Sequence, residues 1–216
     1  MNHSLAAAPR GSETERSRRF IEKLLEGQRK IFGAGGTSSR SVMLSVPHIF
    51  RWWLPLVAAV QLEKCGGTLD ARTKEIAILT TSITNECTYC ISHNKTLGSA
   101  TGVDETIVNA IRNPTLHASL SPRDAAIIEW SQLVTLNQAK YKPAVRERLK
   151  EFFTEGQIVE LTLASAMFCM INRLHDAMAI ELEAPEVVAL LVDAAETTTE
   201  QTLIDYMRST LDLPRT

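Results

Sequence analysis

The sequence predicts an all-α protein, and three observations support this prediction. Apolar residues recur at helical spacing through most of the chain, as Phe20, Leu24 and Ile31 do near its start. Helix-start signals precede several of these runs, and Ser121 followed by Pro122 is the clearest of them. No run alternates apolar and polar residues as a half-buried strand would.

The first part of the chain divides into a polar tail and two helices. Residues 1–15 are polar and irregular, so we expect a disordered tail followed by a single helical domain over residues 16–216. The spacing of apolar residues predicts a helix over about 15–32. Glycine and serine make 33–39 a flexible loop, and a second helix covers about 46–60.

Two helices follow in the middle of the chain. Asp70 caps the first of them, and Glu75 lies on its apolar stripe. The next helix carries a C-x-x-C motif and is expected to end between Gly98 and Gly102. Later helices are predicted over about 103–113, 121–133, 142–153, 159–180 and 199–211.

Composition excludes several classes of function. The chain has 216 residues, 44% of them hydrophobic, and a net charge of −2, so nothing indicates a nucleic-acid partner. The longest apolar runs, such as 187–192, are too short to cross a membrane. The N-terminus lacks the apolar core of a signal peptide, so we expect a cytoplasmic protein. In that compartment a C-x-x-C motif is typical of redox chemistry or of metal binding.

The motif consists of Cys87 and Cys90, which lie on one helix face with Cβ atoms about 5–6 Å apart. That separation allows a disulfide after small adjustments. Asn85 is a good N-cap, although Ser82 or Thr84 could also serve. If the helix starts at Asn85, Cys87 lies in its first turn. The helix dipole then lowers the pKa of its thiol.

Other interpretations of the pair are half of a zinc site and inert packing. The remaining cysteines, Cys65 and Cys169, form no second C-x-x-C motif, so a four-cysteine zinc site is not predicted. We expect both to be small buried hydrophobic residues. Redox chemistry is therefore the preferred interpretation of Cys87 and Cys90.

Three neighbouring polar residues are candidates for the same site. Glu75 is informative because burying a carboxylate costs free energy without a partner, although an exposed glutamate in a salt bridge is the alternative. His93 follows the motif and suits a proton relay or a plain helix-surface histidine equally well. Tyr89 is expected to pack over the two cysteines.

Several segments carry a family resemblance: Arg72–Ala77, Asn85–Cys90, the helix restart after Gly98, and the later Gly156–Leu161 and Ile171–Asp176. Together they resemble the AhpD-like alkylhydroperoxidase and carboxymuconolactone decarboxylase superfamily, in its peroxidase-related branch. The resemblance implies an all-helical fold, a homo-oligomer and a peroxidase that cycles between dithiol and disulfide. We expect no cofactor and no metal.

The resemblance also implies roles for individual residues. It assigns attack on the peroxide to Cys90 and resolution to Cys87, whereas the helix terminus favours Cys87 as the more acidic thiol. Glu75 could serve as a base for the inner thiol. Members of the family usually place a histidine four residues after the second cysteine. Here that position is Asn94, and His93 is rotated by about 100 degrees from it.

Residues outside the motif are expected to have structural roles. His175 and Asp176 are interpreted as structural or interface residues. Trp52 and Trp53 are expected to belong to the core or to a subunit contact, in line with a homo-oligomer.

The predicted function is that of a thiol-dependent peroxidase that reduces hydroperoxides and is itself reduced by an external dithiol or a reductase protein. One alternative is a disulfide reductase or redox sensor with little peroxide turnover. The other is a non-enzymatic helical assembly or regulatory protein.

Overall fold

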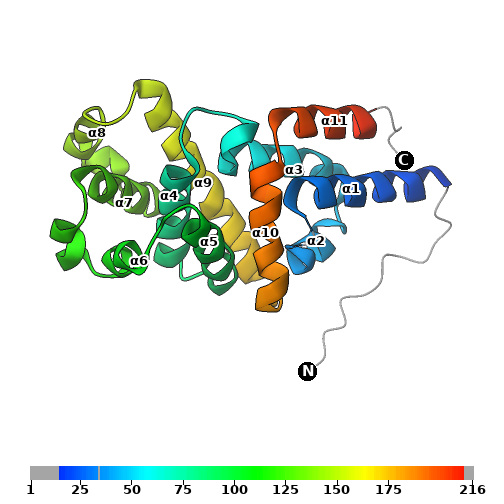
Figure 1. The fold of residues 1–216 in the computed structure, drawn as a ribbon, viewed down its shortest axis with the longest axis horizontal. Helices are drawn as coiled ribbons and strands as arrows, with labels where there is room; N and C mark the ends of the chain where they lie inside the picture. The colour runs from blue at the N-terminus through cyan, green and yellow to red at the C-terminus, as the bar shows by residue number, and fades with distance from the viewer. Residues whose placement is uncertain (1–14, 34, 212–216) are drawn as a thin grey trace.

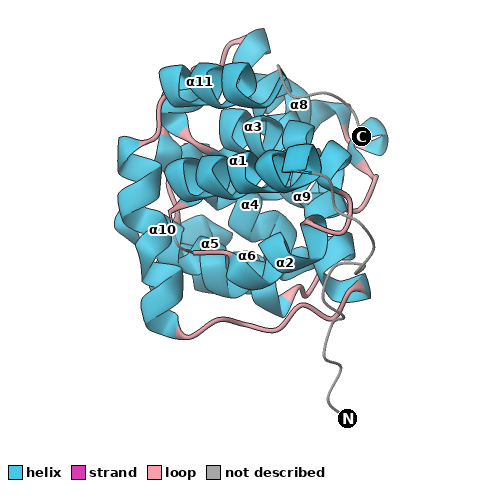
Figure 2. Ribbon diagram, turned by 90° about the vertical axis from the view of Figure 1, so that its right-hand side faces the viewer, coloured by secondary structure: helices cyan, strands magenta, loops and turns pink. Residues whose placement is uncertain are grey.

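The structure is a computed structural model that describes residues 15–33 and 35–211. Every regular element within these ranges is a helix, which confirms the predicted all-α class (Figure 2). The α-helices are α1 (Glu15–Phe32), α2 (Thr37–Met43), α3 (Pro47–Gln61), α4 (Ala71–Thr84), α5 (Thr88–Ala100), α6 (Glu105–Arg112), α7 (Pro122–Thr135), α8 (Pro143–Leu149), α9 (Glu155–Ala177), α10 (Pro185–Thr197) and α11 (Glu200–Leu211). Single 3-10 turns are η1 (Glu63–Cys65), η2 (Pro114–Ser119) and η3 (Ala139–Tyr141).

Two elements differ from the prediction. The predicted loop 33–39 is shorter, because α2 already begins at Thr37. This helix has a single buried residue, Met43, and no apolar stripe that would have indicated it. Helix α10 was not predicted, and the apolar run 187–192 lies inside it. The predicted tail 1–15 lies outside the described residues except for its last position, where α1 begins.

Helix α4 is the centre of the fold and packs against α5, α7 and α9 (Figure 1). Residues 73–82 of α4 are all buried, so this stretch of the helix has no face exposed to solvent. Burial extends to Lys74, whose ammonium group binds the carboxylate of Glu160 at 3.1 Å. A charge at this depth needs such a partner, because desolvation is otherwise costly.

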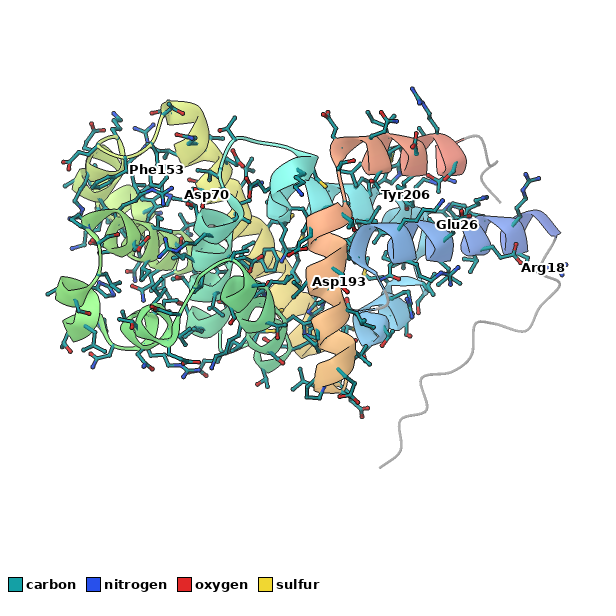
Figure 3. The ribbon with its side chains drawn as sticks, in the orientation of Figure 1. Arg18, Glu26, Asp70, Phe153, Asp193 and Tyr206 are labelled. Carbon is teal, nitrogen blue, oxygen red and sulfur yellow. The ribbon has the colours of Figure 1, made fainter. Side chains whose placement is uncertain are left out.

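Two apolar clusters form the ends of the molecule. One joins α4, α6, α7, α8 and α9 around side chains such as Ile127 and Leu161. The other joins α1, α3 and α11 around Leu24 and Tyr206. Figure 3 shows Phe153 in the left half of the molecule and Tyr206 in the right half. A third cluster lies where α3, α5 and α9 meet, and it contains both cysteines of the motif.

None of the helices in the described part of the chain combines the length and the apolar character that a membrane span requires.

Candidate functional site

The turn between α4 and α5 fixes the position of Cys87. Glu86 adopts a left-handed conformation with φ 59°, and its N–H donates to the carbonyl of Ile83 at 3.1 Å. The N–H of Cys87 donates to the carbonyl of Ser82 at 3.1 Å. These two bonds are those of a Schellman motif, which ends one helix and directs the chain into the next.

Cys87 is therefore the N-cap of α5 rather than a first-turn residue, and Asn85 is the C-cap of α4. The predicted N-cap at Asn85 was wrong because the Schellman turn comes between that residue and α5. Cys90 lies one turn into α5. Both thiols are free, and only 0% of Cys87 and 2% of Cys90 are exposed to solvent.

His175 is the side chain from α9 that completes the site. Its Nδ1 lies 3.2 Å from Sγ of Cys90, and its Nε2 lies 2.9 Å from Oγ of Ser39. The ligand atoms of Cys87, Cys90 and His175 all lie within 4.8 Å of one another. The structural or interface role expected for His175 did not include this contact between its imidazole and the cysteine pair.

The two thiols have different acidities. The thiol of Cys90 can donate to a thiolate at Cys87, and this contact lowers the pKa of Cys87 although burial opposes it. The same contact and burial raise the pKa of Cys90. When the pair loses one proton, the negative charge therefore lies on Cys87, beside a Cys90 thiol. Cys87 is thus the more acidic thiol, as the helix-terminus argument expected, but the main cause is its contact with the Cys90 thiol.

His175 is uncharged near neutral pH. Burial, together with repulsion from His93, lowers the pKa of His175 to about 4. A neutral imidazole carries one proton and one free lone pair, so it can accept a proton at one nitrogen and release one from the other. Here the two nitrogens face Cys90 and Ser39.

His93 faces Glu183 and the backbone of Tyr89. Its Nδ1 lies 2.8 Å from the carbonyl oxygen of Tyr89, and its Nε2 lies 3.0 Å from Oε2 of Glu183. Both ring nitrogens therefore lie beside oxygen acceptors. Tyr89 stacks on this ring with centroids 4.1 Å apart. The interpretation of His93 as a helix-surface residue was wrong, since only 7% of it is exposed.

Glu183 joins two helices, α2 and α5, beside the site. It accepts from the N–H of Ser38 at 2.7 Å and from the hydroxyl of Tyr89 at 3.0 Å, and its Oε2 lies 3.0 Å from Nε2 of His93. Burial acts to raise the pKa of Glu183, but the hydrogen bonds from His93 and Ser38 outweigh it and lower the pKa to about 2. The carboxylate thus anchors α2, which carries Ser39, over the cysteine helix.

Glu75 is buried, as its place on the apolar stripe predicted, but it contacts no sulfur atom in the described structure. Its Oε1 accepts from Nε2 of Gln61 at 3.1 Å, and the same nitrogen donates to Oδ1 of Asn94 at 3.0 Å. Asn94 in turn donates to the carbonyl of Cys90 at 2.8 Å. Two amides therefore separate the carboxyl group from the cysteines, so its expected direct action on a thiol is corrected.

Glu75 also carries a proton near neutral pH and is therefore not available as a base. Burial raises the pKa of Glu75 to about 8, although the hydrogen bond from Gln61 opposes the shift. Near neutral pH the group is a carboxylic acid. Its Oε2 has no hydrogen-bond partner among the described residues.

A second set of amides supports the turn that holds the cysteines. Nδ2 of Asn172, on α9, donates to Oγ of Ser82 at 3.3 Å, and its Oδ1 accepts from Asn85 at 2.9 Å. Asn172 also acts to lower the pKa of Cys90, although the net shift is upward. No local pattern singles out Ser39 or Gln61, and Asn172 entered only as part of the segment Ile171–Asp176 that carries the family resemblance. None of the three stands near the motif along the chain.

An apolar cavity of about 130 Å³ leads to the site. Cys90 and His175 are part of its wall, whereas Cys87 is not. Trp53, which was expected in the core or at a subunit contact, also belongs to this wall. The other apolar side chains that line the cavity are Phe32, Phe50, Leu54, Val57, Leu97, Phe168, Ile171 and Leu191.

The free cysteines outside the motif are not part of the site. Cys65 is buried, as expected, and burial raises the pKa of its thiol to about 11. Cys169 is half-buried, so the expectation of full burial is wrong for it.

Fold and site together define an all-helical protein with a buried dithiol at the end of an apolar cavity. The sequence profile of the carboxymuconolactone decarboxylase family matches residues 47–132. The fold is similar to a crystal structure described as an alkylhydroperoxidase AhpD core, an uncharacterized peroxidase-related protein from Ralstonia eutropha JMP134. The two chains are 19% identical with a TM-score of 0.64, over 86% of this chain and 98% of the other.

No curated protein matches the chain. The family match and the shared fold nevertheless confirm the predicted resemblance to the AhpD-like and carboxymuconolactone decarboxylase superfamily.

Proposed function

We propose that the protein is a thiol-dependent peroxidase in which Cys90 attacks the hydroperoxide, Cys87 resolves the product, and His175 moves the proton. One observation carries the proposal: the contact of 3.2 Å between Cys90 and His175, at the wall of a cavity and beside a second thiol. A nucleophile, a neutral base and a resolving thiol are the groups that a dithiol peroxidase needs.

Access favours Cys90 as the attacking residue although Cys87 is the more acidic thiol. The cavity reaches Cys90, and Cys87 has no exposed surface. A hydroperoxide in the cavity therefore meets Cys90 first. The Cys90 thiol must lose its proton as it attacks, and His175 Nδ1 lies in position to receive it.

The first step converts the thiol and the hydroperoxide to a sulfenic acid and an alcohol. The sulfur of Cys90 attacks the terminal oxygen, and the O–O bond breaks. The thiol proton passes to Nδ1 of His175, while Nε2 releases its proton through the Ser39 hydroxyl to the departing alkoxide. The products are Cys90–SOH and ROH, so atoms and charge balance.

The second step forms the disulfide. The Cys87 thiolate attacks the sulfenic sulfur of Cys90, and the hydroxyl group leaves as water with the proton that Nδ1 of His175 gained in the first step. Nε2 of His175 regains a proton from solvent through the Ser39 hydroxyl, which restores the starting tautomer. An external dithiol then reduces the disulfide by thiol–disulfide exchange. We place this cycle in the reducing cytoplasm, where an exchange partner is present.

The cavity supports a preference for compact apolar substrates. Its volume of about 130 Å³ is close to that of an engineered protein cavity that holds benzene, about 150 Å³. We therefore propose that tert-butyl and cumene hydroperoxides react faster than long-chain lipid hydroperoxides. A larger rate constant for a long-chain hydroperoxide would contradict this preference.

The same cysteine pair would also suit a disulfide reductase or redox sensor. Burial of both sulfur atoms disfavours that alternative, because a protein disulfide has to reach the attacking thiol. Peroxide consumption with dithiothreitol as reductant tests the proposal, together with peptide mapping after brief substoichiometric peroxide. We expect turnover and a Cys87–Cys90 disulfide. A pair that stays reduced while Cys65 or Cys169 oxidises would contradict the proposal.

A homo-oligomer is proposed on the basis of an exposed face of α3. Ile49, Trp52 and Leu56 are 59%, 52% and 51% exposed, and their spacing places them on one side of the helix. We expect a second copy of the chain to cover this face. In light scattering at micromolar concentration, Trp52→Glu should dissociate the oligomer, whereas Tyr141→Glu, at an exposed aromatic residue on η3, should not. A monomer of 23.9 kDa for the unmodified chain would contradict the proposal.

A further inference from the structure

The reduced site has the geometry of a metal centre as well as that of a peroxidase. The ligand atoms of Cys87, Cys90 and His175 lie within 4.8 Å of one another, and all three side chains are buried. Two thiolates and one imidazole form a soft ligand set, which selects zinc over magnesium or calcium. Neither Cys65 nor Cys169 belongs to this cluster.

The surroundings of His175 match those of a zinc ligand. The ring nitrogen that faces Cys90 is Nδ1, and the other nitrogen, Nε2, lies 2.9 Å from Oγ of Ser39. When the hydroxyl accepts from Nε2–H, the lone pair of Nδ1 points toward the sulfur atoms. Metal-bound histidines in proteins are usually oriented by a second hydrogen bond of this kind.

The backbone also favours two thiolates at this point. Cys87 is the N-cap of α5, and Cys90 is one turn inside it. The unpaired N–H groups of a helix start stabilise negative charge on nearby sulfur. The spacing of two residues between the cysteines is also the spacing at which zinc sites use such a pair.

The coordination position that remains faces the cavity. Cys90 and His175 form part of the cavity wall, so a water molecule or a small ligand has room there. Three protein ligands with one open position is the arrangement of zinc sites in which a solvent molecule is the fourth ligand.

We propose that the reduced protein binds one zinc ion through Cys87 Sγ, Cys90 Sγ and His175 Nδ1, with the fourth position open to the cavity. Zinc and the disulfide use the same sulfur atoms and therefore exclude each other. Bound zinc also occupies the sulfur lone pair that attacks the peroxide and the nitrogen that accepts the proton. The metal thus keeps the protein in a reduced form that does not react with hydroperoxides.

Cobalt substitution tests the site on the reduced full-length chain without oxygen. One equivalent of Co²⁺ should produce the sulfur-to-cobalt charge-transfer absorption and the intense visible bands of a tetrahedral thiolate site, and Zn²⁺ should displace it. Cys87→Ser and Cys90→Ser should abolish the charge-transfer absorption or strongly reduce it. Ser39→Ala should weaken binding about 10- to 100-fold, as expected for the loss of a hydrogen bond to a ligand.

The matched controls are Cys65→Ser and Cys169→Ser, which should bind cobalt as the unmodified chain does. The disulfide form of the unmodified chain should bind none, and this comparison requires no substitution that could disturb folding. The proposal is overturned if the reduced chain gives no thiolate–cobalt absorption, or if binding persists in the disulfide form. Peroxide turnover measured with a chelator present tests the proposed peroxidase separately, so the two proposals can fail independently.

Discussion

Two polar clusters flank the cysteine pair, and only one of them reaches a sulfur atom. On the α4 side, Glu75, Gln61 and Asn94 form a chain of hydrogen bonds that ends at the backbone carbonyl of Cys90. On the α9 side, the imidazole of His175 contacts the sulfur of Cys90 directly. The first cluster contains a neutral acid and two amides, and the second contains a titratable ring.

The two clusters differ in which helix places an imidazole beside the sulfur of Cys90. Position 94 of α5 faces the Glu75 cluster, but an asparagine occupies it. His93, one residue earlier, is rotated toward Glu183, whose Oε2 lies 3.0 Å from its Nε2. The imidazole beside the thiol comes instead from α9, which packs against α5. The proposed chemistry requires a base near Cys90, and it does not require that base to lie on the same helix.

The largest effect is expected at the sulfur atom that both clusters surround. Cys90→Ser should abolish peroxide consumption, because a serine hydroxyl is a far weaker nucleophile than a thiolate. The peroxide assay with dithiothreitol measures this loss. Cys169→Ser is the matched control, since Cys169 is a half-buried cysteine of α9 outside the site, and it should leave the rate unchanged. Substantial activity in Cys90→Ser would assign the attack to another residue.

An imidazole placed at position 94 instead of position 175 should test the comparison between the two clusters. In a chain that carries His175→Ala, we expect Asn94→His to raise the rate about 10-fold above that of His175→Ala alone. A histidine contributes about 10²–10⁴-fold as a general base, and the smaller gain is expected because the placement of the new ring is not optimised. The new ring would stand one turn after Cys90, beside Gln61 and Glu75. Single-turnover disulfide formation measures the rescue.

Asn94→Gln in the same background is the control for a larger side chain at that position. It keeps an amide and should rescue nothing. If both substitutions restore the rate equally, the imidazole is not the cause.

A smaller effect, on stability and not on activity, is expected from Glu183, whose carboxylate anchors α2. The pKa of Glu183 is lowered from its ordinary value of 4.5 to about 2, so the folded state binds this proton less tightly than the unfolded chain does. Its contribution to the free energy of unfolding is therefore complete above pH 4.5 and is lost as the pH falls toward 2. The shift corresponds to about 3 kcal/mol.

Urea unfolding between about pH 6 and pH 2 measures this contribution. The unmodified chain should lose more stability over this range than Glu183→Gln does. Equal pH profiles for the two proteins would show that the ion pair with His93 does not stabilise the fold.

The sequence predicted the fold class and the half of the site that is local in the chain. Helical spacing indicated the all-α class, and the C-x-x-C motif identified Cys87 and Cys90. The position of Glu75 on an apolar stripe correctly indicated that it is buried. These features depend on neighbours within one or two turns of the same helix, so the sequence contains them directly.

The other half of the site depends on tertiary packing. His175 and Cys90 are separated by 85 positions, and Ser39 and His175 by 136. Their contacts arise because α2, α5 and α9 meet, which no local pattern reveals. His175 did carry one available signal, since it lies seven positions after Phe168 on the buried face of α9. A histidine on such a face requires a polar partner.

The measurement that tests the central claim most directly compares His175→Ala with Glu75→Gln in single-turnover disulfide formation. Each variant removes the titratable group of one cluster, and circular dichroism confirms that each keeps its helices. We predict that His175→Ala slows the reaction by about 10²–10⁴-fold. Glu75→Gln should change it by no more than about 3-fold, because the carboxyl group is already neutral and contacts no thiol. A severe loss of rate in Glu75→Gln together with a small loss in His175→Ala would contradict the account and assign the proton transfer to Glu75 on α4.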